Sequence, residues 1–228
     1  PEATGWSSVA RYADPLLEDA TTRAAIRFVA THGYNGAPYA YETPSEHGKE
    51  FWQTEVSEEN GPAGDTGMAS GAWLGIRIHN DLTRANLNAW HYWWLLPRGD
   101  VPTDSNSALV QDGAFTRRAY VLGNFSRFVR PGSVRVETAP AAPGGNIYVS
   151  AYQSPDAREL IVVAVNASPV DVDQELELAG VEVAELTPWL TSEDAALEPQ
   201  APVAVDSATF RYTLPTRSVT TFVGSLSD

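Results

Sequence analysis

The sequence changes its rhythm close to residue 132, and this change limits the folds that the chain can adopt. Before that point, short apolar segments alternate with amphipathic helical segments, a pattern that favours βαβ units and a parallel sheet. After it, short apolar segments follow one another from Val134 to Val223, separated by turn signals such as Pro143-Gly144-Gly145. Such spacing is typical of an antiparallel β-sandwich. We therefore expect an α/β region over residues 1–132 and a β-sandwich over residues 133–228.

The first region holds too few strands to close on itself. Residues 26–31, 50–55 and 89–95 have the composition of strands, and residues 68–85 keep the apolar spacing of a helix. A closed βα barrel of the common type has eight strands, and a small open parallel sheet would leave apolar edges bare. Pro1-Glu2 is typical of the tail of an earlier strand. We infer that the chain is the C-terminal part of a larger fold, whose other part belongs to another chain or is missing.

Composition excludes several classes of function. The net charge of −14 repels phosphate backbones and anionic membranes, so we expect neither nucleic acid nor a membrane as a partner. The chain has no cysteine, which removes disulfides, thiol catalysis and cysteine metal sites. Its four histidines are scattered and form no HExxH pattern, so we expect no metal and no cofactor.

Two motifs at the ends of predicted strands indicate carbohydrate chemistry. Trp52-Gln53-Thr54-Glu55 ends on a carboxylate, and Trp90-His91-Tyr92-Trp93-Trp94 places large aromatic rings at the end of the next strand. A carboxylate can attack or stabilise an oxocarbenium-like centre, and aromatic rings can stack against the apolar face of a sugar.

The sequence resembles glycoside hydrolase family 30, the xylanase and glucosylceramidase-like retaining hydrolases, along its whole length. The residues that carry this resemblance are Pro1-Glu2 with Trp6, Thr31-His32-Gly33-Tyr34, Trp52-Gln53-Thr54-Glu55 and Trp90-His91-Tyr92-Trp93-Trp94, which look like the ends of barrel strands five to eight, and residues 118–132, which look like the last barrel helix. The resemblance implies the C-terminal part of a (β/α)8 TIM barrel with an attached antiparallel β-sandwich. It also implies cleavage of β-glycosidic bonds with retention of configuration.

The resemblance further implies roles for three residues. Glu55 matches the nucleophile, Tyr34 is expected to donate a hydrogen bond to Glu55, and His32 is expected to bind a sugar hydroxyl. The family's acid/base Glu ends the fourth barrel strand, and nothing in this chain matches it. A retaining mechanism needs two carboxyl groups about 5–5.5 Å apart, so we expect the chain to be inactive by itself.

Three tryptophans and one further carboxylate are additional candidates. Trp93 and Trp94 are adjacent, so on a strand they point in opposite directions, one as a sugar platform and the other under the outer helices. Trp94 is the favoured platform. Trp6 is a further binding candidate, with packing in its loop as the alternative. Glu2 also stands at a strand end, but we favour an acid/base residue outside this chain.

These expectations describe a secreted, retaining, endo-acting β-glycosidase that hydrolyses xylan or glucuronoxylan by double displacement. Its partners are the polysaccharide and an N-terminal half of the barrel, and secretion is expected because polymeric plant-wall substrates cannot enter cells. The alternatives are a family 30 β-1,6-galactanase or β-1,6-glucanase, or a non-enzymatic carbohydrate-binding fragment. Leu95-Leu96-Pro97-Arg98 does not reproduce the Arg-rich run of one xylan-type branch, so recognition of a glucuronyl side chain is left open.

Overall fold

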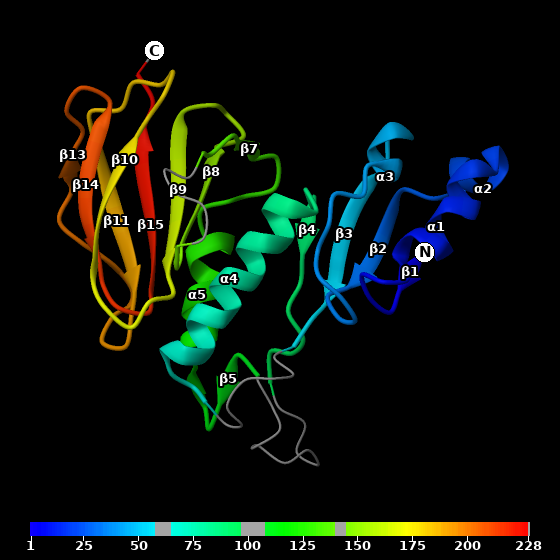
Figure 1. Ribbon diagram of the computed structural model, residues 1–228, viewed down its shortest axis with the longest axis horizontal. Helices are drawn as coiled ribbons and strands as arrows, with labels where there is room; N and C mark the ends of the chain where they lie inside the picture. The colour runs from blue at the N-terminus through cyan, green and yellow to red at the C-terminus, as the bar shows by residue number, and fades with distance from the viewer. Residues whose placement is uncertain (58–64, 97–107, 140–144, 228) are drawn as a thin grey trace.

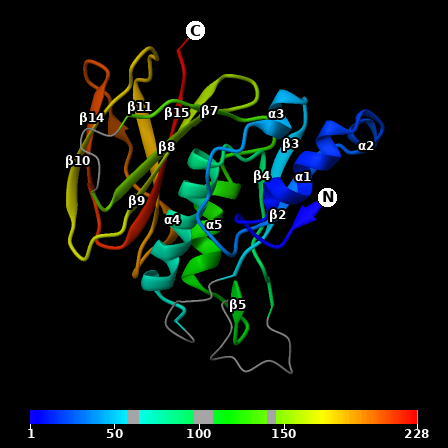
Figure 2. The ribbon, with the colours of Figure 1, turned by 45° about the vertical axis from the view of Figure 1, so that its right-hand side comes forward.

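The computed structural model describes residues 1–57, 65–96, 108–139 and 145–227, and its elements lie in layers (Figure 1). Parallel strands lie on one side of the molecule and antiparallel strands on the other. Helices α4 (Met68–Arg84) and α5 (Arg117–Ser126) lie between the two groups in both ribbon views (Figures 1 and 2). The change of rhythm in the sequence therefore corresponds to a change from parallel to antiparallel strands.

The first layer is a four-stranded parallel sheet. Its strands, in order across the sheet, are β1 (Glu2–Ala3), β2 (Phe28–His32), β3 (Glu50–Glu55) and β4 (Ala89–Trp90). Helices α1 (Val9–Glu18) and α2 (Ala20–Ala25) precede β2, and α3 (Thr43–Glu46) precedes β3. The register joins Glu2 to Ala30, Ala30 to Trp52 and Trp52 to Ala89, so all four strands end at the same edge.

The sheet agrees with the sequence in part. The expected strand 50–55 is confirmed, the strand expected at 26–31 begins at Phe28, and Glu2 is paired as expected for the end of an earlier strand. The expected strand 89–95 is wrong beyond Trp90. Beyond Trp90 the segment is not a regular strand, although the Trp93 amide still donates to the carbonyl of Val56 next to β3. The carbonyls of Trp94 and Leu95 then accept hydrogen bonds from the backbone amides of residues 109 and 110.

The two faces of the parallel sheet differ in what covers them. Val29 and Phe51 are buried against Val9 and Leu17 of α1. On the opposite face, Phe28 and Trp52 stack at a centroid distance of 4.1 Å and stay partly exposed. This alternation follows from the two-residue period of a strand.

The antiparallel strands form two sheets. A seven-stranded sheet has the order β12-β11-β15-β9-β8-β7, with β13 paired to β11, and β10 pairs with β14 in the second sheet. The bounds are β7 (Val134–Val136), β8 (Ile147–Gln153), β9 (Glu159–Asn166), β10 (Val172–Glu177), β11 (Glu185–Thr191), β12 (Ala196–Pro199), β13 (Val203–Ala204), β14 (Thr209–Leu214) and β15 (Ser218–Ser225). A short hairpin of β5 (Val110–Gln111) and β6 (Ala114–Phe115) precedes α5.

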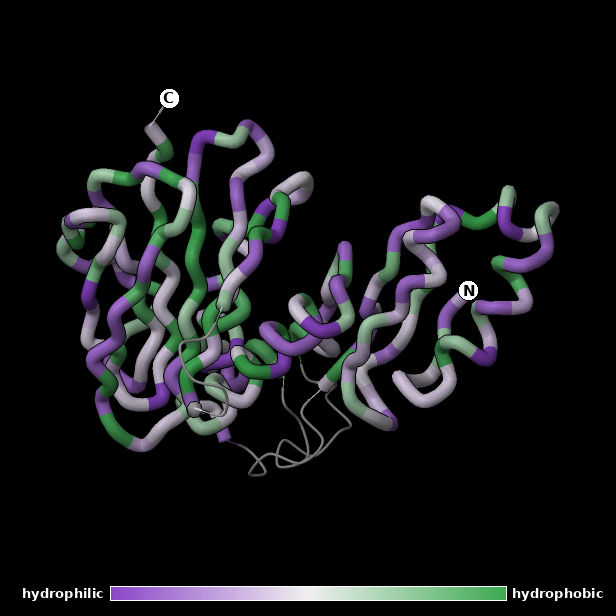
Figure 3. The backbone as a smooth tube through the Cα atoms, turned by 45° about the horizontal axis from the view of Figure 1, so that its top comes forward, coloured by the Kyte–Doolittle hydropathy of each residue, from purple (hydrophilic) through white to green (hydrophobic). Residues whose placement is uncertain are grey.

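Strand β9 has buried side chains on both faces of the large sheet, and the hydropathy colouring shows it as a hydrophobic run (Figure 3). Val163 and Val165 pack against helices α4 and α5 in one buried cluster, whereas Val162 and Ala164 pack in another with Phe210 of β14. Among the described residues, no helix is long and apolar enough to cross a membrane.

A buried amide joins the helix layer to the large sheet. Asn124 of α5 donates to the carbonyl of Trp189 (2.9 Å) and to Thr221 Oγ1 (3.0 Å), and its Oδ1 accepts from Thr191 Oγ1 (2.6 Å). Asn124 is fully buried, and each of these contacts offsets part of the cost of burying a polar group. The helices are therefore held to the antiparallel sheet by polar contacts as well as by packing.

Candidate active site

The C-terminal edge of the parallel sheet brings together three of the residues expected from the sequence. Glu55 ends β3, His32 ends β2, and Tyr34 follows two residues later. A register shift between Thr31 and His32 places His32 opposite Glu55. In parallel βα folds, the C-terminal ends of strands are where catalytic groups gather.

Glu55 is surrounded by groups that can stabilise its charge. The Tyr34 hydroxyl donates to Glu55 Oε1 at 3.3 Å, as expected from the sequence, and His32 Nδ1 lies 3.7 Å from the same oxygen. The Glu55 side chain is 28% exposed, so a ligand can reach it while Tyr34 and His32 contact its Oε1. The arrangement presents a carboxylate with a fixed direction to the space above the sheet.

The phenol of Tyr34 is itself held in place. The backbone amide of Ser57 donates to the Tyr34 hydroxyl at 3.1 Å, and the Tyr34 ring packs edge-to-face on His32. Burial raises the pKa of Tyr34, and the negative charge of Glu55 raises it further, while the contacts with Ser57 oppose these effects. The hydroxyl therefore stays protonated at neutral pH and remains a donor to Glu55.

Glu2 lies at the same edge, on the other side of His32. Its Oε1 accepts a hydrogen bond from Thr54 Oγ1 at 2.5 Å and lies 3.4 Å from His32 Nε2. Parallel register places Glu2 next to β2, and Thr54 reaches it across that strand. The sequence presents Glu2 only as a candidate catalytic partner, and its contact with Thr54 depends on the register of three strands.

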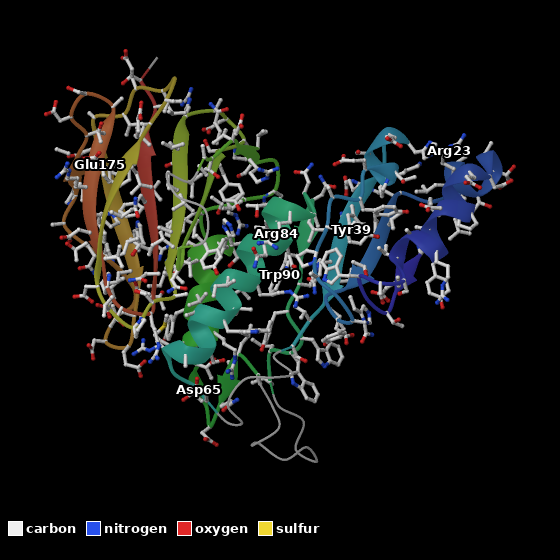
Figure 4. The ribbon with its side chains drawn as sticks, in the orientation of Figure 1. Arg23, Tyr39, Asp65, Arg84, Trp90 and Glu175 are labelled. Atoms are coloured by element: carbon white, nitrogen blue, oxygen red, sulfur yellow. The ribbon has the colours of Figure 1, made fainter. Side chains whose placement is uncertain are left out.

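A buried ion pair on helix α4 lies behind the strand ends. Arg77 Nε contacts both carboxylate oxygens of Asp81, at 3.1 and 3.0 Å, and Asp81 is fully buried. The Trp90 indole donates to Asp81 at 2.8 Å, and Arg77 also donates to the carbonyl of Gly33, between His32 and Tyr34. Figure 4 shows Trp90 between α4 and the parallel strands.

Sequence reasoning did not find this ion pair. The signal that could have revealed it is an Arg and an Asp four residues apart on the helix that follows the carboxylate strand.

The aromatic pair after β4 differs from the expectation. Trp93 and Trp94 do not point in opposite directions: their rings stack at 5.6 Å with an interplanar angle of 12°. The prediction failed because these residues follow the end of the strand, where the two-residue period no longer applies. Trp93 is 47% exposed and Trp94 is less exposed, so Trp93 presents more ring surface than the favoured Trp94. The Trp93 amide donates to the carbonyl of Val56, which places this segment beside Glu55.

Trp6 is not available to a sugar in this structure. Its side chain is 1% exposed and packs edge-to-face on Phe51 and Tyr39. The binding interpretation is therefore corrected in favour of packing. Its backbone still serves the site, because the Trp6 amide donates to the Tyr34 carbonyl at 3.0 Å.

Two further expectations concern glucuronyl recognition and metal binding. Pro97 and Arg98, which bear on glucuronyl recognition, lie outside the described residues. In the described ranges, no group of three or more His, Cys, Asp or Glu side chains could hold a metal ion.

The chain is similar to known xylanases. It is 33% identical to the glucuronoxylanase XynC of Bacillus subtilis strain 168, in a match that covers 92% of this chain and 49% of that protein. A GH30 endoxylanase from Clostridium papyrosolvens C71 superposes with a TM-score of 0.82 at 30% identity, covering 99% of this chain and 55% of that one. A family 30 subfamily 8 xylanase from Clostridium acetobutylicum gives a TM-score of 0.85 at 29% identity, with the same coverage.

The chain spans about half the length of the curated relatives that it matches, which is consistent with a C-terminal portion. No family model matches the chain.

Proposed function

The chain is a homologue of glycoside hydrolase family 30 xylanases that spans about half of their length, and we propose that it supplies the nucleophile half of a retaining endo-β-xylanase. The observation that carries this proposal is Glu55 at the end of β3, with the Tyr34 hydroxyl and the His32 imidazole at its Oε1. These contacts hold in place the carboxylate that would attack the sugar.

The proposed reaction is a double displacement on xylan or glucuronoxylan. Glu55 attacks the anomeric carbon, the bond to the leaving oxygen breaks, and an acid residue outside this chain gives that oxygen a proton. The same residue then removes a proton from water, and the water oxygen displaces Glu55 and restores its carboxylate. Tyr34 keeps Glu55 oriented through both steps, and His32 binds a sugar hydroxyl.

The rest of the fold is proposed on the same basis. Residues 1–132 form the C-terminal part of a (β/α)8 barrel and residues 133–228 a side domain, and an N-terminal half, as a segment or a separate chain, supplies the acid/base. The four parallel strands and the partly exposed Phe28–Trp52 face support this arrangement, because they leave a face of the sheet to be covered. Secretion follows from the size of the substrate.

Sugar binding is proposed for the stacked pair after β4. The Trp93 and Trp94 rings lie parallel, and Trp93 is the more exposed of the two. An exposed ring whose backbone is hydrogen-bonded next to Glu55 can stack against a pyranose beside the scissile bond.

The test is hydrolysis of glucuronoxylan by the preparation that contains both parts of the fold, alongside this chain purified alone. We expect xylo-oligosaccharides from the first and none from the second. Glu55→Gln should abolish turnover, whereas the control Glu50→Gln, at the other end of the same strand, should not. Release of sugars from β-1,6-galactan or β-1,6-glucan but not from xylan would contradict the proposed substrate. No hydrolysis of any of these glycans would contradict the proposal that the protein is an enzyme.

A further inference from the structure

Glu2 is a carboxylate at the same strand edge as Glu55, and the proposed reaction gives it no role. It belongs to β1, and its Oε1 meets two groups from two other strands: Thr54 Oγ1 at 2.5 Å and His32 Nε2 at 3.4 Å. Thr54 directly precedes Glu55 in the chain. Glu2 is therefore tied to the strand that carries the nucleophile as well as to the histidine beside it.

His32 stands between two carboxylates. Its Nε2 faces Glu2 at 3.4 Å and its Nδ1 faces Glu55 at 3.7 Å, so the two ring nitrogens are directed at different acids. A neutral imidazole has one N–H and one lone pair, whereas the imidazolium has two N–H groups. Only the charged ring can donate to both acids, and a ring held on one side by Glu2 presents its other nitrogen to Glu55.

Resting on the proposed function, we propose that Glu2 is a positioning residue that acts on Glu55 through His32 and Thr54. Glu2 orients the His32 ring and fixes the last residue before the nucleophile, so that the carboxylate of Glu55 is presented in one direction. Productive geometry in such a site is sensitive to shifts of about 1 Å, which is why a contact that never touches the sugar affects turnover.

Two other roles for Glu2 make different predictions. A general acid protonates the leaving oxygen, so its loss matters for xylan but little for an aryl xyloside whose leaving group needs no proton. Loss of a direct ligand of a ground-state sugar hydroxyl raises KM and leaves kcat unchanged. Loss of a positioning residue lowers kcat on both substrates and leaves KM close to its original value.

The experiment compares Glu2→Gln with Glu50→Gln in the active preparation that contains this chain, on xylan and on an activated aryl β-xyloside. We expect Glu2→Gln to lower kcat about ten- to hundredfold on both substrates, because it removes the charge that faces His32 Nε2 and that accepts from Thr54 Oγ1. Thr54→Val should lower kcat in the same way by a smaller factor, and Glu50→Gln should leave it unchanged. A loss confined to xylan, or a change confined to KM, would overturn the proposal.

A second readout does not depend on activity. At one fixed pH, the ring nitrogen NMR signals of His32, assigned with His32→Gln, should move in Glu2→Gln and stay in place in Glu50→Gln. If the protein hydrolyses no glycan, this measurement still tests the contact, and so separates a failure of the positioning role from a failure of the proposed function. Unchanged His32 signals in Glu2→Gln would overturn the proposal.

Discussion

Breaking the buried Arg77–Asp81 ion pair on helix α4 should lower the free energy of unfolding far more than breaking an exposed ion pair of similar length. Its Nε–Oδ2 distance is 3.0 Å, and the side chains are 19% and 0% exposed, respectively. Removing one partner of a buried pair leaves an uncompensated charge and costs about 3–5 kcal/mol. Arg77→Met should therefore lower the melting temperature by about 6–20 °C, at about 2–4 °C for each kcal/mol in a chain of this size.

The chain offers a matched control on its surface. Arg211 and Glu175 approach to 2.5 Å, but their side chains are 82% and 53% exposed. Exposed pairs contribute about 0–1 kcal/mol, so Arg211→Met should shift the melting temperature by no more than about 4 °C. The shorter pair should therefore be the weaker one, because burial decides the magnitude.

Two further measurements isolate the charge. Burial raises the pKa of Asp81 and Arg77 opposes that rise, so the uncompensated carboxyl in Arg77→Met takes up a proton more readily. The loss of stability should consequently be smaller at pH 5 than at pH 8. In an Asp81→Asn background, Arg77→Met should cost at least about 2 kcal/mol less than in the wild type. Equal shifts for Arg77→Met and Arg211→Met, or full additivity with Asp81→Asn, would refute this reasoning.

Three other changes have defined outcomes. Burial, reinforced by Arg84 and Arg135, lowers the pKa of His79 to about 4, below its ordinary 6.5. Mainly the unfolded chain therefore takes up this proton as the pH falls from 7 to 4. The free energy of unfolding measured in denaturant melts should fall by up to about 3 kcal/mol over this range, and His79→Leu should remove this fall. Gly33→Ala should destabilise the fold by about 1–3 kcal/mol in the same melts, because its Cβ would lie 2.8 Å from the Cβ of Val56, which cannot move without its backbone, and an unchanged midpoint would contradict this. Tyr34→Phe should lower kcat on xylan about tenfold or more by removing the donor to Glu55, and unchanged kcat would remove Tyr34 from the site.

The sequence predicted those parts of the fold that local pattern controls. Strand β3 has the expected bounds, and helix α4 begins at Met68 as expected. The contact of Tyr34 with Glu55 followed from the resemblance, since both residues occupy matching strand ends. In each case the residues involved are set by their position at the end of a strand and need no knowledge of distant contacts.

The rest depended on contacts between distant segments. The direction of Trp94 could not follow from a two-residue period, because β4 ends at Trp90 and the carbonyl of Trp94 pairs with residue 109, which is distant in the sequence. The burial of Trp6 is decided by Phe51 and Tyr39, which come from a later strand and loop. The contact of Glu2 with Thr54 spans three strands and follows from their register.

The proposed function depends most directly on a covalent bond between Glu55 and the sugar. The most direct measurement is to incubate the preparation containing both parts with a 2-fluoro xyloside that has an activated leaving group, which slows release of the intermediate, and then to sequence the labelled peptide by mass spectrometry. We expect one fluoro-glycosyl adduct, on Glu55, and none in Glu55→Gln. A label on any other residue, or turnover that persists in Glu55→Gln, would contradict it.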